Sequence, residues 1–394
     1  MDIKGFRFSA VESAIKKPGR LDLALIESDR PAATAAVFTT NSVKAAPVLL
    51  SMERVAVGPI RAVVVNSGNA NACTGGQGMA DALETTRLVA RYLNVDEAEV
   101  LVASTGVIGI PLPMDRLAVA LHPLVNSLPD GAGLDVVARA IMTTDTFPKM
   151  EARRGTANGK QYTIAGVAKG SGMIMPNMAT MLAFIITDAA VEPQWLEQIF
   201  RTGCDESFNA ITVDGDTSTN DTALILANGA AGNEPLGSNS EGAPEFVRLL
   251  DEVLLSLARQ IVRDGEGATK FVTITVAGAL NDNHAKKAAL AIANSSLVKT
   301  AFFGQDANWG RILAAVGYSG VTVDQDKIDL HFDDVLMARN GIFAGGDAEA
   351  RGSAVLRQKE FSVTVDLNLG MGRATVYTSD LSHDYVSINA AYRT

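Results

Sequence analysis

Residues 63–93 read VVVNSGNANACTGGQGMADALETTRLVARYL, and three structural signals follow one another in this stretch. The opening run of valines is typical of a buried strand, and the Asn- and Gly-rich residues 66–78 predict a loop. From Met79 to Leu93 apolar residues recur at three- and four-residue steps, which predicts one apolar face of a helix that Asn94 can cap. A buried strand followed by an amphipathic helix predicts an α/β architecture.

The same alternation continues on both sides of this stretch. Residues 100–103 predict a second buried strand that ends at Ser104, Thr105 and Gly106, and residues 246–261 predict a long helix. From Val272 onward the pattern changes to half-buried strands, with alternating stretches at residues 272–276, 327–332, 361–369 and 373–378. We therefore expect a first domain over residues 1–280 and a smaller C-terminal α+β domain over residues 281–394.

Composition limits the classes of partner. Of the 394 residues, 47% are hydrophobic and 20% are charged, so the chain has ample material for a buried core. It carries 34 Lys and Arg against 44 Asp and Glu, a formal net charge of −10. This acidic balance repels phosphate backbones, so we expect no nucleic-acid partner.

The sequence also argues against metals, disulfides and membranes. The two cysteines, Cys73 and Cys204, are far apart, and the four histidines show no ligand spacing. Residues 214–221 resemble a calcium loop, but Thr219 replaces the required glycine and Ile225 the required glutamate. No signal peptide and no run of ~18 apolar residues occurs. We therefore expect a cytoplasmic protein without a metal site.

Residues 169–186, KGSGMIMPNMATMLAFII, are the most unusual stretch. A glycine-rich segment leads through Ala179 to Thr180 and then into an apolar strand. If the bond between Ala179 and Thr180 were cut, the freed α-amine, with an ordinary pKa of ~7.7–8.0, would stand beside the threonine hydroxyl and could take its proton. From this pattern alone, however, an ordinary strand threonine is the commoner explanation.

Sequence motifs for other chemistries are missing. Gly170, Ser171 and Gly172 lack the flanking glycines of a hydrolase nucleophile elbow. Neither a phosphate-binding G-x-x-x-x-G-K-[ST] motif nor a dinucleotide-binding G-x-G-x-x-G motif follows a strand. The segment 66–71 has two interpretations, a turn of residues that tolerate left-handed backbone or a wall of the active site.

A family resemblance favours the nucleophile over the ordinary strand residue as the interpretation of Thr180. The run GMIMPNMATML at residues 172–182 resembles the cleavage and nucleophile motif of the glutamate/ornithine N-acetyltransferase family of arginine biosynthesis. Further stretches along nearly the whole chain are similar to that family: VNSGNANA at 65–72, ASTGVIG at 103–109, IMTTDT at 141–146, DGEGATK at 264–270 and NWGR at 308–311. We find no departure at a functional position.

The resemblance implies a fold, a processing step and a site. It implies a layered αββα sandwich of the N-terminal-nucleophile type, followed by the smaller domain. Self-cleavage between Ala179 and Thr180 would give fragments 1–179 and 180–394, assembled as a heterotetramer with two of each. The implied nucleophile is Thr180 and the implied oxyanion hole is Thr105 with Gly106. The implied substrate-binding residues are Thr143, Lys169, Thr180, Glu266, Asn389 and Thr394.

The implied reaction is transfer of an acetyl group from N2-acetylornithine to glutamate through an acetyl-threonine intermediate. No cofactor is expected, although some relatives also use acetyl-coenzyme A as an acetyl donor. We expect Lys169 to bind a carboxylate and Glu266 the ornithine ammonium group; the plain alternatives are a solvated loop lysine and an acid at a helix end. Two other functions remain open: a self-processing amidase or aminopeptidase of the same fold, and a non-catalytic binding protein.

Overall fold

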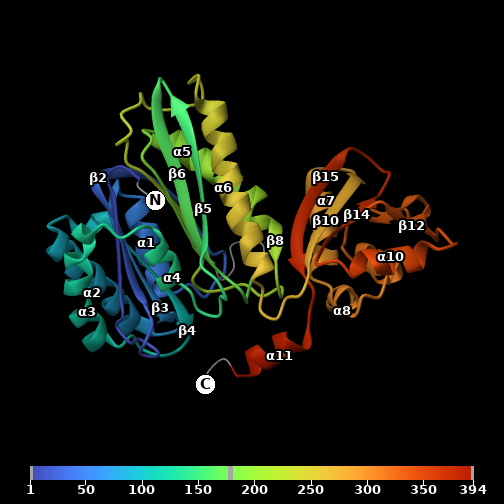
Figure 1. Cartoon of the computed structure of the whole chain (residues 1–394), viewed down its shortest axis with the longest axis horizontal. Coiled ribbons are helices and arrows are strands. Elements are labelled where there is room, and N and C mark those ends of the chain that lie inside the picture. The colour runs from blue at the N-terminus through green and yellow to red at the C-terminus, as the bar shows by residue number, and fades with distance from the viewer. Residues whose placement is uncertain (1–2, 176–180, 392–394) are drawn as a thin grey trace. The chain divides into compact units, whose positions relative to one another are not determined.

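The computed structural model describes residues 3–175 and 181–391 of the chain. These residues form two compact units (Figure 1). Unit 1 comprises Met1–Asn209 and Asp216–Ile261, and unit 2 comprises Ala210–Gly215 and Val262–Thr394. Unit 1 therefore contains the segments that lead to and from the expected nucleophile.

A mixed sheet runs through unit 1 in the order β4-β3-β2-β9-β7-β6-β5, with β1 paired to β2. Strands β3 and β4 are parallel, as are β7 and β9, while the other neighbours are antiparallel. The strands are β1 Phe6–Val11, β2 Leu23–Phe38, β3 Ile60–Asn69, β4 Val100–Val107, β5 Lys149–Ala157, β6 Lys160–Lys169, β7 Leu182–Thr187 and β9 Thr222–Ala227.

The long strand β2 divides this sheet into two parts. Its first part pairs with β1 and β3 and its second part with β9, and the register with β3 shifts between Glu27 and Ala32. Pro31 lies in this irregular stretch, where a residue without a backbone N–H costs no ladder hydrogen bond. Alternate residues of both parts then share one buried core, which includes Val63 of β3 and Phe184 of β7. The two parts of the sheet thus pack against each other.

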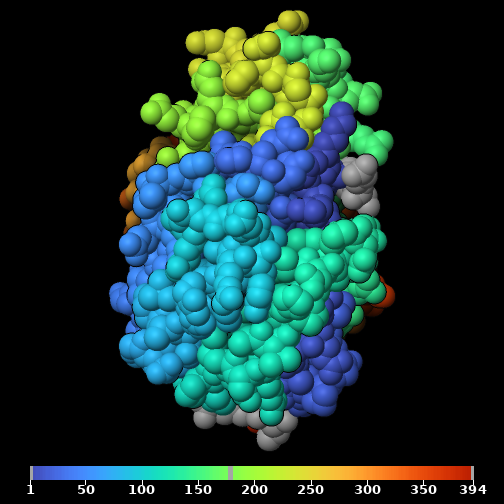
Figure 2. Space-filling view, turned by 90° about the vertical axis from the view of Figure 1, so that its left-hand side faces the viewer, coloured from blue at the N-terminus to red at the C-terminus, as the bar shows by residue number. Residues whose placement is uncertain are grey.

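Helices cover the outer face of each part. Against the first part, Val64 and Val102 pack with Val89 and Leu121 from two helices, α2 Gly75–Leu93 and α3 Met114–Asn126. Figure 2 shows these two helices, coloured cyan to green, on the outside of unit 1. Helix α1 Ala46–Val55 joins the same core through Leu50.

On the second part, a methyl group added to Gly166 of β6 would meet Val253 and Leu257 of α6 Ala243–Arg263, so that helix packs directly on β6. Helix α5 Pro193–Glu206 lies beside α6, because a methyl group at Gly203 would meet Leu254. The short helix α4 Asp135–Ala140 contributes to the core between the two parts of the sheet. The resulting order of layers, helix, sheet, sheet and helix, confirms the expected αββα sandwich.

The segment around residues 63–93 folds largely as predicted. Helix α2 ends at Leu93, and Asn94 follows it in left-handed conformation with φ +55°, which confirms the cap. The predicted loop is shorter than expected, because β3 continues through Asn69 and α2 begins at Gly75. Likewise β4 continues past Ser104 to Val107, since it stays paired with the extended end of β3.

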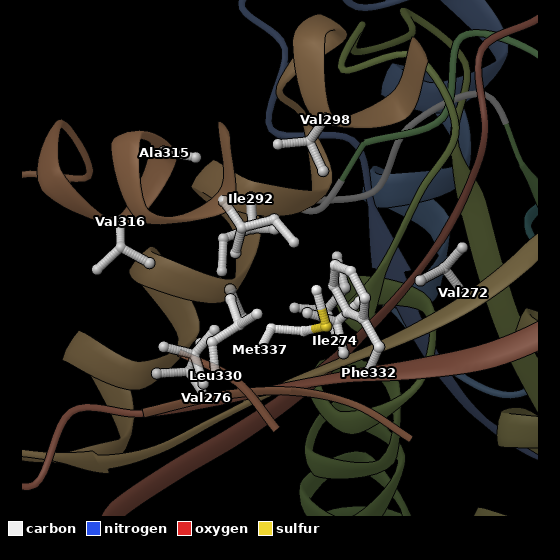
Figure 3. Packing of buried hydrophobic residues seen from close by; sticks show 14 of the residues in the cluster. Val272, Ile274, Val276, Ile292, Val298, Ala315, Val316, Leu330, Phe332 and Met337 are labelled. Atoms are coloured by element: carbon white, nitrogen blue, oxygen red, sulfur yellow. The ribbon is translucent and has the colours of Figure 1, made fainter. Parts of the chain in front are cut away.

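Unit 2 has its own mixed sheet in the order β13-β12-β11-β14-β10-β15-β8. Val272, Ile274 and Val276 of β10 point into a core with Phe332 and Met337 (Figure 3), which confirms the half-buried strand predicted there. The strands are β8 Ile211–Thr212, β10 Phe271–Ala279, β11 Asp329–Phe332, β12 Val335–Arg339, β13 Ile342–Phe343, β14 Glu360–Asp366 and β15 Gly372–Ser379. The helices are α7 Asp282–Ala293, α8 Ser296–Gly304, α9 Trp309–Gly317, α10 Ala348–Leu356 and α11 His383–Ala390.

The boundary between the units differs from the expected position near residue 280. Strand β10 was assigned to residues 1–280, yet it pairs in parallel with β14 and in antiparallel register with β15. Its ladder hydrogen bonds and its buried valines therefore belong to unit 2. The change of unit falls at Ile261 and Val262, near the end of α6.

Short 3-10 turns complete the described elements, at Glu97–Glu99, Leu128–Asp130, Phe208–Ala210 and Gln325–Lys327. Within residues 3–175 and 181–391, each helix is too short or too polar to cross a membrane.

Candidate active site

The expected oxyanion residues lie at the end of β4. In the ladder with β3, Thr105 pairs with Ser67 and Gly106 with Gly68. Gly106 has φ +137°, and an added Cβ would lie 2.3 Å from the carbonyl carbon of Gly68. Only glycine fits here, because the backbone of β3 occupies the space that any side chain would need.

Buried polar side chains hold these two strand ends together. Ser104 Oγ donates a hydrogen bond to Asn66 Oδ1 at 2.6 Å, and Asn66 Nδ2 donates to the carbonyl of Asn69 at 2.9 Å. Ser67 Oγ donates to the carbonyl of Ala140 at the end of α4. The segment 66–71 therefore fixes the geometry of the neighbouring strand end, and its role as a wall of the active site stays a prediction.

Lys169 reaches the same strand end from β6. Its side chain is 2% exposed, and Nζ donates a hydrogen bond to Thr105 Oγ1 across 3.4 Å. Strand β6 fixes this position, because Lys169 pairs with Leu182 at the start of β7. The alternative of a solvated loop lysine is wrong, since residue 169 lies buried at the end of a strand. Two residues that the sequence assigned separately are in contact.

Asp145 connects Thr143 to the residue that follows Lys169. Its Oδ2 accepts a hydrogen bond from the Thr143 N–H at 2.9 Å, and its Oδ1 accepts from the Gly170 N–H at 2.8 Å and from Lys149 Nζ at 2.7 Å. Burial alone would raise the pKa of Asp145, but the charges of Lys169 and Lys149 outweigh it and hold that pKa below its usual range. An ionised carboxylate thus fixes Thr143 and the residue after Lys169.

The chain that follows the expected nucleophile is anchored by Asp221. Ala179 and Thr180 lie outside the described residues. The next residue, Met181, donates its N–H to Asp221 Oδ1 at 2.8 Å, and Leu182 begins the buried strand β7. Burial raises the pKa of Asp221 well above its ordinary value, despite the Met181 N–H and the charge of Lys169.

The remaining expected residues lie in unit 2. Glu266 is in the loop between α6 and β10, is 8% exposed, and accepts a hydrogen bond from Asn389 Nδ2 of α11 at 2.8 Å. Asp380 fixes the end of this loop, because its Oδ1 accepts hydrogen bonds from the N–H groups of Thr269 at 2.8 Å and Lys270 at 2.9 Å. Glu266 and Asn389 are thus a contacting pair. Thr394 lies outside the described residues.

Sequence reasoning missed three buried polar residues of unit 1: Asp145, Lys149 and Asp221. Asp145 stands inside the IMTTDT stretch that carries the family resemblance, so a signal existed. Asp221 stands inside the segment 214–221, which was weighed only as a calcium loop and then set aside. Lys149 carried no signal, because only the fold shows that it is fully buried beside Asp145.

Comparison with known proteins places the chain among its relatives. It is 72% identical over its full length to the "Arginine biosynthesis bifunctional protein ArgJ" of Geobacter sulfurreducens, with 100% of both chains covered. It is 54% identical to the protein of the same name from Syntrophotalea carbinolica, with 100% of this chain and 99% of that protein covered.

A crystal structure of the protein of that name from Bacillus halodurans is 41% identical and superposes with a TM-score of 0.52, covering 53% of this chain and 98% of that one. The sequence model of the ArgJ family matches residues 7–394, which include every described site residue. With its whole length accounted for by that match and by relatives of this identity, the chain belongs to the ArgJ family.

Proposed function

We propose that this chain is a glutamate N-acetyltransferase of arginine biosynthesis, which moves an acetyl group from N2-acetylornithine to glutamate. The observation that carries the proposal is the 72% identity, over the complete length of both chains, to a bifunctional arginine-biosynthesis protein. The contact between Lys169 and Thr105 near the start of β7 supports it. It puts a cation beside the expected oxyanion hole, where a positive charge favours the negative charge that develops on the carbonyl oxygen during acyl transfer.

Activation begins with self-cleavage at Thr180. Its hydroxyl attacks the carbonyl carbon of Ala179, the peptide nitrogen leaves as the α-amine of Thr180, and an ester joins the two fragments. Water then hydrolyses that ester, which restores the hydroxyl and releases the carboxylate of Ala179. Fragments 1–179 and 180–394 remain together, because the partners of β7 in unit 1 come from both: β6 precedes the cut and β9 follows it.

The mature Thr180 then works by double displacement. Its α-amine takes the hydroxyl proton as the oxygen attacks the acetyl carbonyl of N2-acetylornithine. Ornithine leaves with that proton on its α-amine, and the acetyl group stays on Thr180 as an ester. The α-amine of glutamate attacks this ester, N-acetylglutamate departs, and the hydroxyl regains its proton. The acetyl group is conserved through the cycle.

Residues other than Thr180 supply the remaining roles in this proposal. Thr105 and Gly106 stabilise the oxyanion of each tetrahedral intermediate, and loss of one such donor would slow turnover by ~10²-fold or more. Lys169 and Thr143 bind the substrate carboxylate, and Asp145 keeps both in place. Glu266 binds the ornithine ammonium group, with Asn389 orienting it. Thr394 completes the proposed substrate-binding set.

The word "bifunctional" in the names of the relatives supports a second donor, acetyl-coenzyme A, for acetylation of glutamate. We further propose a cytoplasmic enzyme assembled from two of each fragment. Acetylation of glutamate by purified protein supplied with acetyl-coenzyme A alone tests the second donor, and the mass of the native assembly tests the heterotetramer.

Mass spectrometry of the purified protein tests the central proposal. Two masses that divide at Ala179 and Thr180 are expected, with a third species, acetylated on the C-terminal fragment, after incubation with N2-acetylornithine. Thr180→Ala should give one uncut chain without transfer activity. Thr187→Ala, at the other end of β7, is the matched control and should cleave normally. Transfer by the uncut Thr180→Ala protein would refute the proposal.

Acetate release separates the transferase from the amidase. A hydrolase would release acetate from N2-acetylornithine at the same rate with and without glutamate, because water is its acceptor. The transferase should instead form N-acetylglutamate at the expense of acetate as the glutamate concentration rises. A single uncut polypeptide that acquires no acetyl group would favour the non-catalytic binding protein.

A further inference from the structure

Two consecutive residues, Asn220 and Asp221, form hydrogen bonds to residues next to the proposed oxyanion hole and next to the proposed nucleophile. Asn220 Nδ2 donates hydrogen bonds to the carbonyl of Ser104 at 2.9 Å and to the carbonyl of Ala70 at 2.6 Å. Asp221 Oδ1 accepts the N–H of Met181 at 2.8 Å. Ser104 is covalently joined to Thr105, and Met181 to Thr180. The segment 220–221 is thus hydrogen-bonded both to the end of β4, which carries the proposed oxyanion hole, and to the residue after the proposed nucleophile.

Both side chains are deeply buried, so these contacts are not exchanged for water. Asn220 is 5% exposed and Asp221 is 0% exposed. Among the described residues, Asp221 Oδ2 has no hydrogen bond of good geometry, although the side chains of Thr39 and Ser218 lie near enough to lower the pKa of Asp221, and a buried carboxyl that is only partly satisfied is costly. An apolar residue of similar shape would remove that cost but would leave the buried Met181 N–H without its acceptor.

The backbone around these residues is fixed as well. The Thr222 N–H donates to the Met181 carbonyl at 3.1 Å, and the Thr39 N–H donates to the Asp221 carbonyl at 3.1 Å. Strand β9 begins at Thr222 and runs parallel to β7. The segment 220–221 therefore cannot shift without moving β7, whose first residue is two positions after Thr180.

We propose that Asn220 and Asp221 are positioning residues that set the distance between the oxyanion hole and the Thr180 nucleophile. This proposal rests on the proposed function. Attack on a carbonyl requires the hydroxyl and the oxyanion donors to face the same carbon, and a misplacement of ~1 Å can cost ~10²-fold in rate. Self-cleavage and acetyl transfer share this requirement, so both steps depend on the pair.

Leucine substitutions test the pair, because leucine keeps the approximate shape of either side chain but forms no hydrogen bond. Asp221→Leu and Asn220→Leu should each slow self-cleavage, followed by mass spectrometry, by at least about tenfold. In the cleaved fraction, kcat for acetyl transfer should fall by a similar factor, while KM for N2-acetylornithine changes by less than about threefold. Asp221→Asn keeps the acceptor oxygen and should restore cleavage and kcat.

The opposite end of the same sheet provides matched controls. Asp188, at the end of β7, accepts the Thr163 N–H at 2.7 Å, and Asn233 Nδ2 donates to the carbonyls of Ala190 at 3.0 Å and Glu234 at 2.7 Å. Both are buried. Asp188→Leu and Asn233→Leu lose equivalent bonds and should lower the unfolding temperature without changing kcat.

The outcomes separate this inference from the proposed function. If Asp221→Leu and Asn220→Leu cleave and turn over like their matched controls, or if Asp221→Asn is as slow as Asp221→Leu, the pair does not position the site and the inference is wrong. If Thr180→Ala retains cleavage and transfer, the proposed function itself has failed. If Thr180→Ala loses activity as expected but Asp221→Leu is unimpaired, the inference is wrong and the proposed function stands.

Discussion

Lys149 Nζ lies 2.7 Å from Asp145 Oδ1, and the side chains of both residues are completely buried. Such an ion pair contributes little net stability compared with apolar packing, because both charges have been removed from water. Its value here is structural, since the ionised Asp145 also accepts the N–H groups of Thr143 and Gly170. Lys149 is thus the counter-ion that allows a buried carboxylate to fix the backbone at Thr143 and Gly170, beside the proposed substrate-binding residues.

We predict that Lys149→Met lowers the free energy of unfolding by roughly 3–5 kcal/mol, because it leaves a buried carboxylate without one of its two lysines. Urea unfolding checks this value. Arg139→Met removes the exposed partner of Asp135, a pair in which both side chains are 53% exposed, and should cost less than about 1 kcal/mol. Equal losses in the two variants would contradict the proposed role of Lys149.

Gly106 provides a second prediction. Gly106→Ala puts a Cβ 2.3 Å from the backbone of Gly68 and also requires φ +137°, so the strand end must move. We expect acetyl transfer to fall by about 10²-fold or more, because the proposed oxyanion donors move with it. Gly109→Ala is the control: Gly109 has φ +82° but no atom within 4 Å of an added Cβ. Similar kcat values for both variants would count against an oxyanion role.

Glu266 provides a third prediction, which concerns charge alone. Glu266→Gln keeps an oxygen that can accept from Asn389 Nδ2, so the loop geometry should be retained. Loss of the proposed charged contact to the ornithine ammonium group should raise KM for N2-acetylornithine by roughly 10- to 100-fold, since such bonds contribute about 1.5–3 kcal/mol. Glu360→Gln, in an exposed pair with Arg263, should leave KM unchanged. An unchanged KM in Glu266→Gln would refute the assignment.

The sequence predicted more of the fold than of the site. Strand β10 and helix α2 follow from hydrophobic periodicity, because each buries one continuous face within its own unit. The boundary near residue 280 failed for a physical reason: β10 pairs with strands more than eighty positions later, and periodicity carries no information on strand partners. Thr105 and Lys169 were found through family motifs, whereas their contact across 64 positions is a property of the folded sheet.

Buried polar residues were the hardest to predict. Asn220 and Asp221 look like turn residues in a sequence, since Asn and Asp are common in turns for their local hydrogen bonds. Their actual partners, Ser104 and Met181, lie 116 and 40 positions away. Only the fold shows that the two side chains form hydrogen bonds with distant backbone groups, so the sequence could not predict their role.

Lys299 of α8 provides the last prediction, on the pH dependence of stability. Its side chain is 3% exposed, and Nζ donates to Thr378 Oγ1 at 2.9 Å and to the carbonyl of Ser379. Burial lowers the pKa of Lys299 to about 7, against the opposing charges of Asp380 and Asp214. In the unfolded chain the same amine titrates near 10.5.

Between these two pKa values the unfolded chain binds a proton that the folded protein does not. The free energy of unfolding should therefore rise with pH above about 7, at up to about 1.4 kcal/mol per pH unit from this residue, and the gain should level off as the pH passes 10.5. Lys299→Met removes this contribution, so the stability difference between variant and wild type should change steadily between pH 7 and 10. Lys327→Met, which removes a 53% exposed lysine of the same unit, should show no such change in urea unfolding. Parallel pH profiles for wild type and Lys299→Met would mean that Lys299 stays charged in the folded protein, held by Asp380 and Asp214.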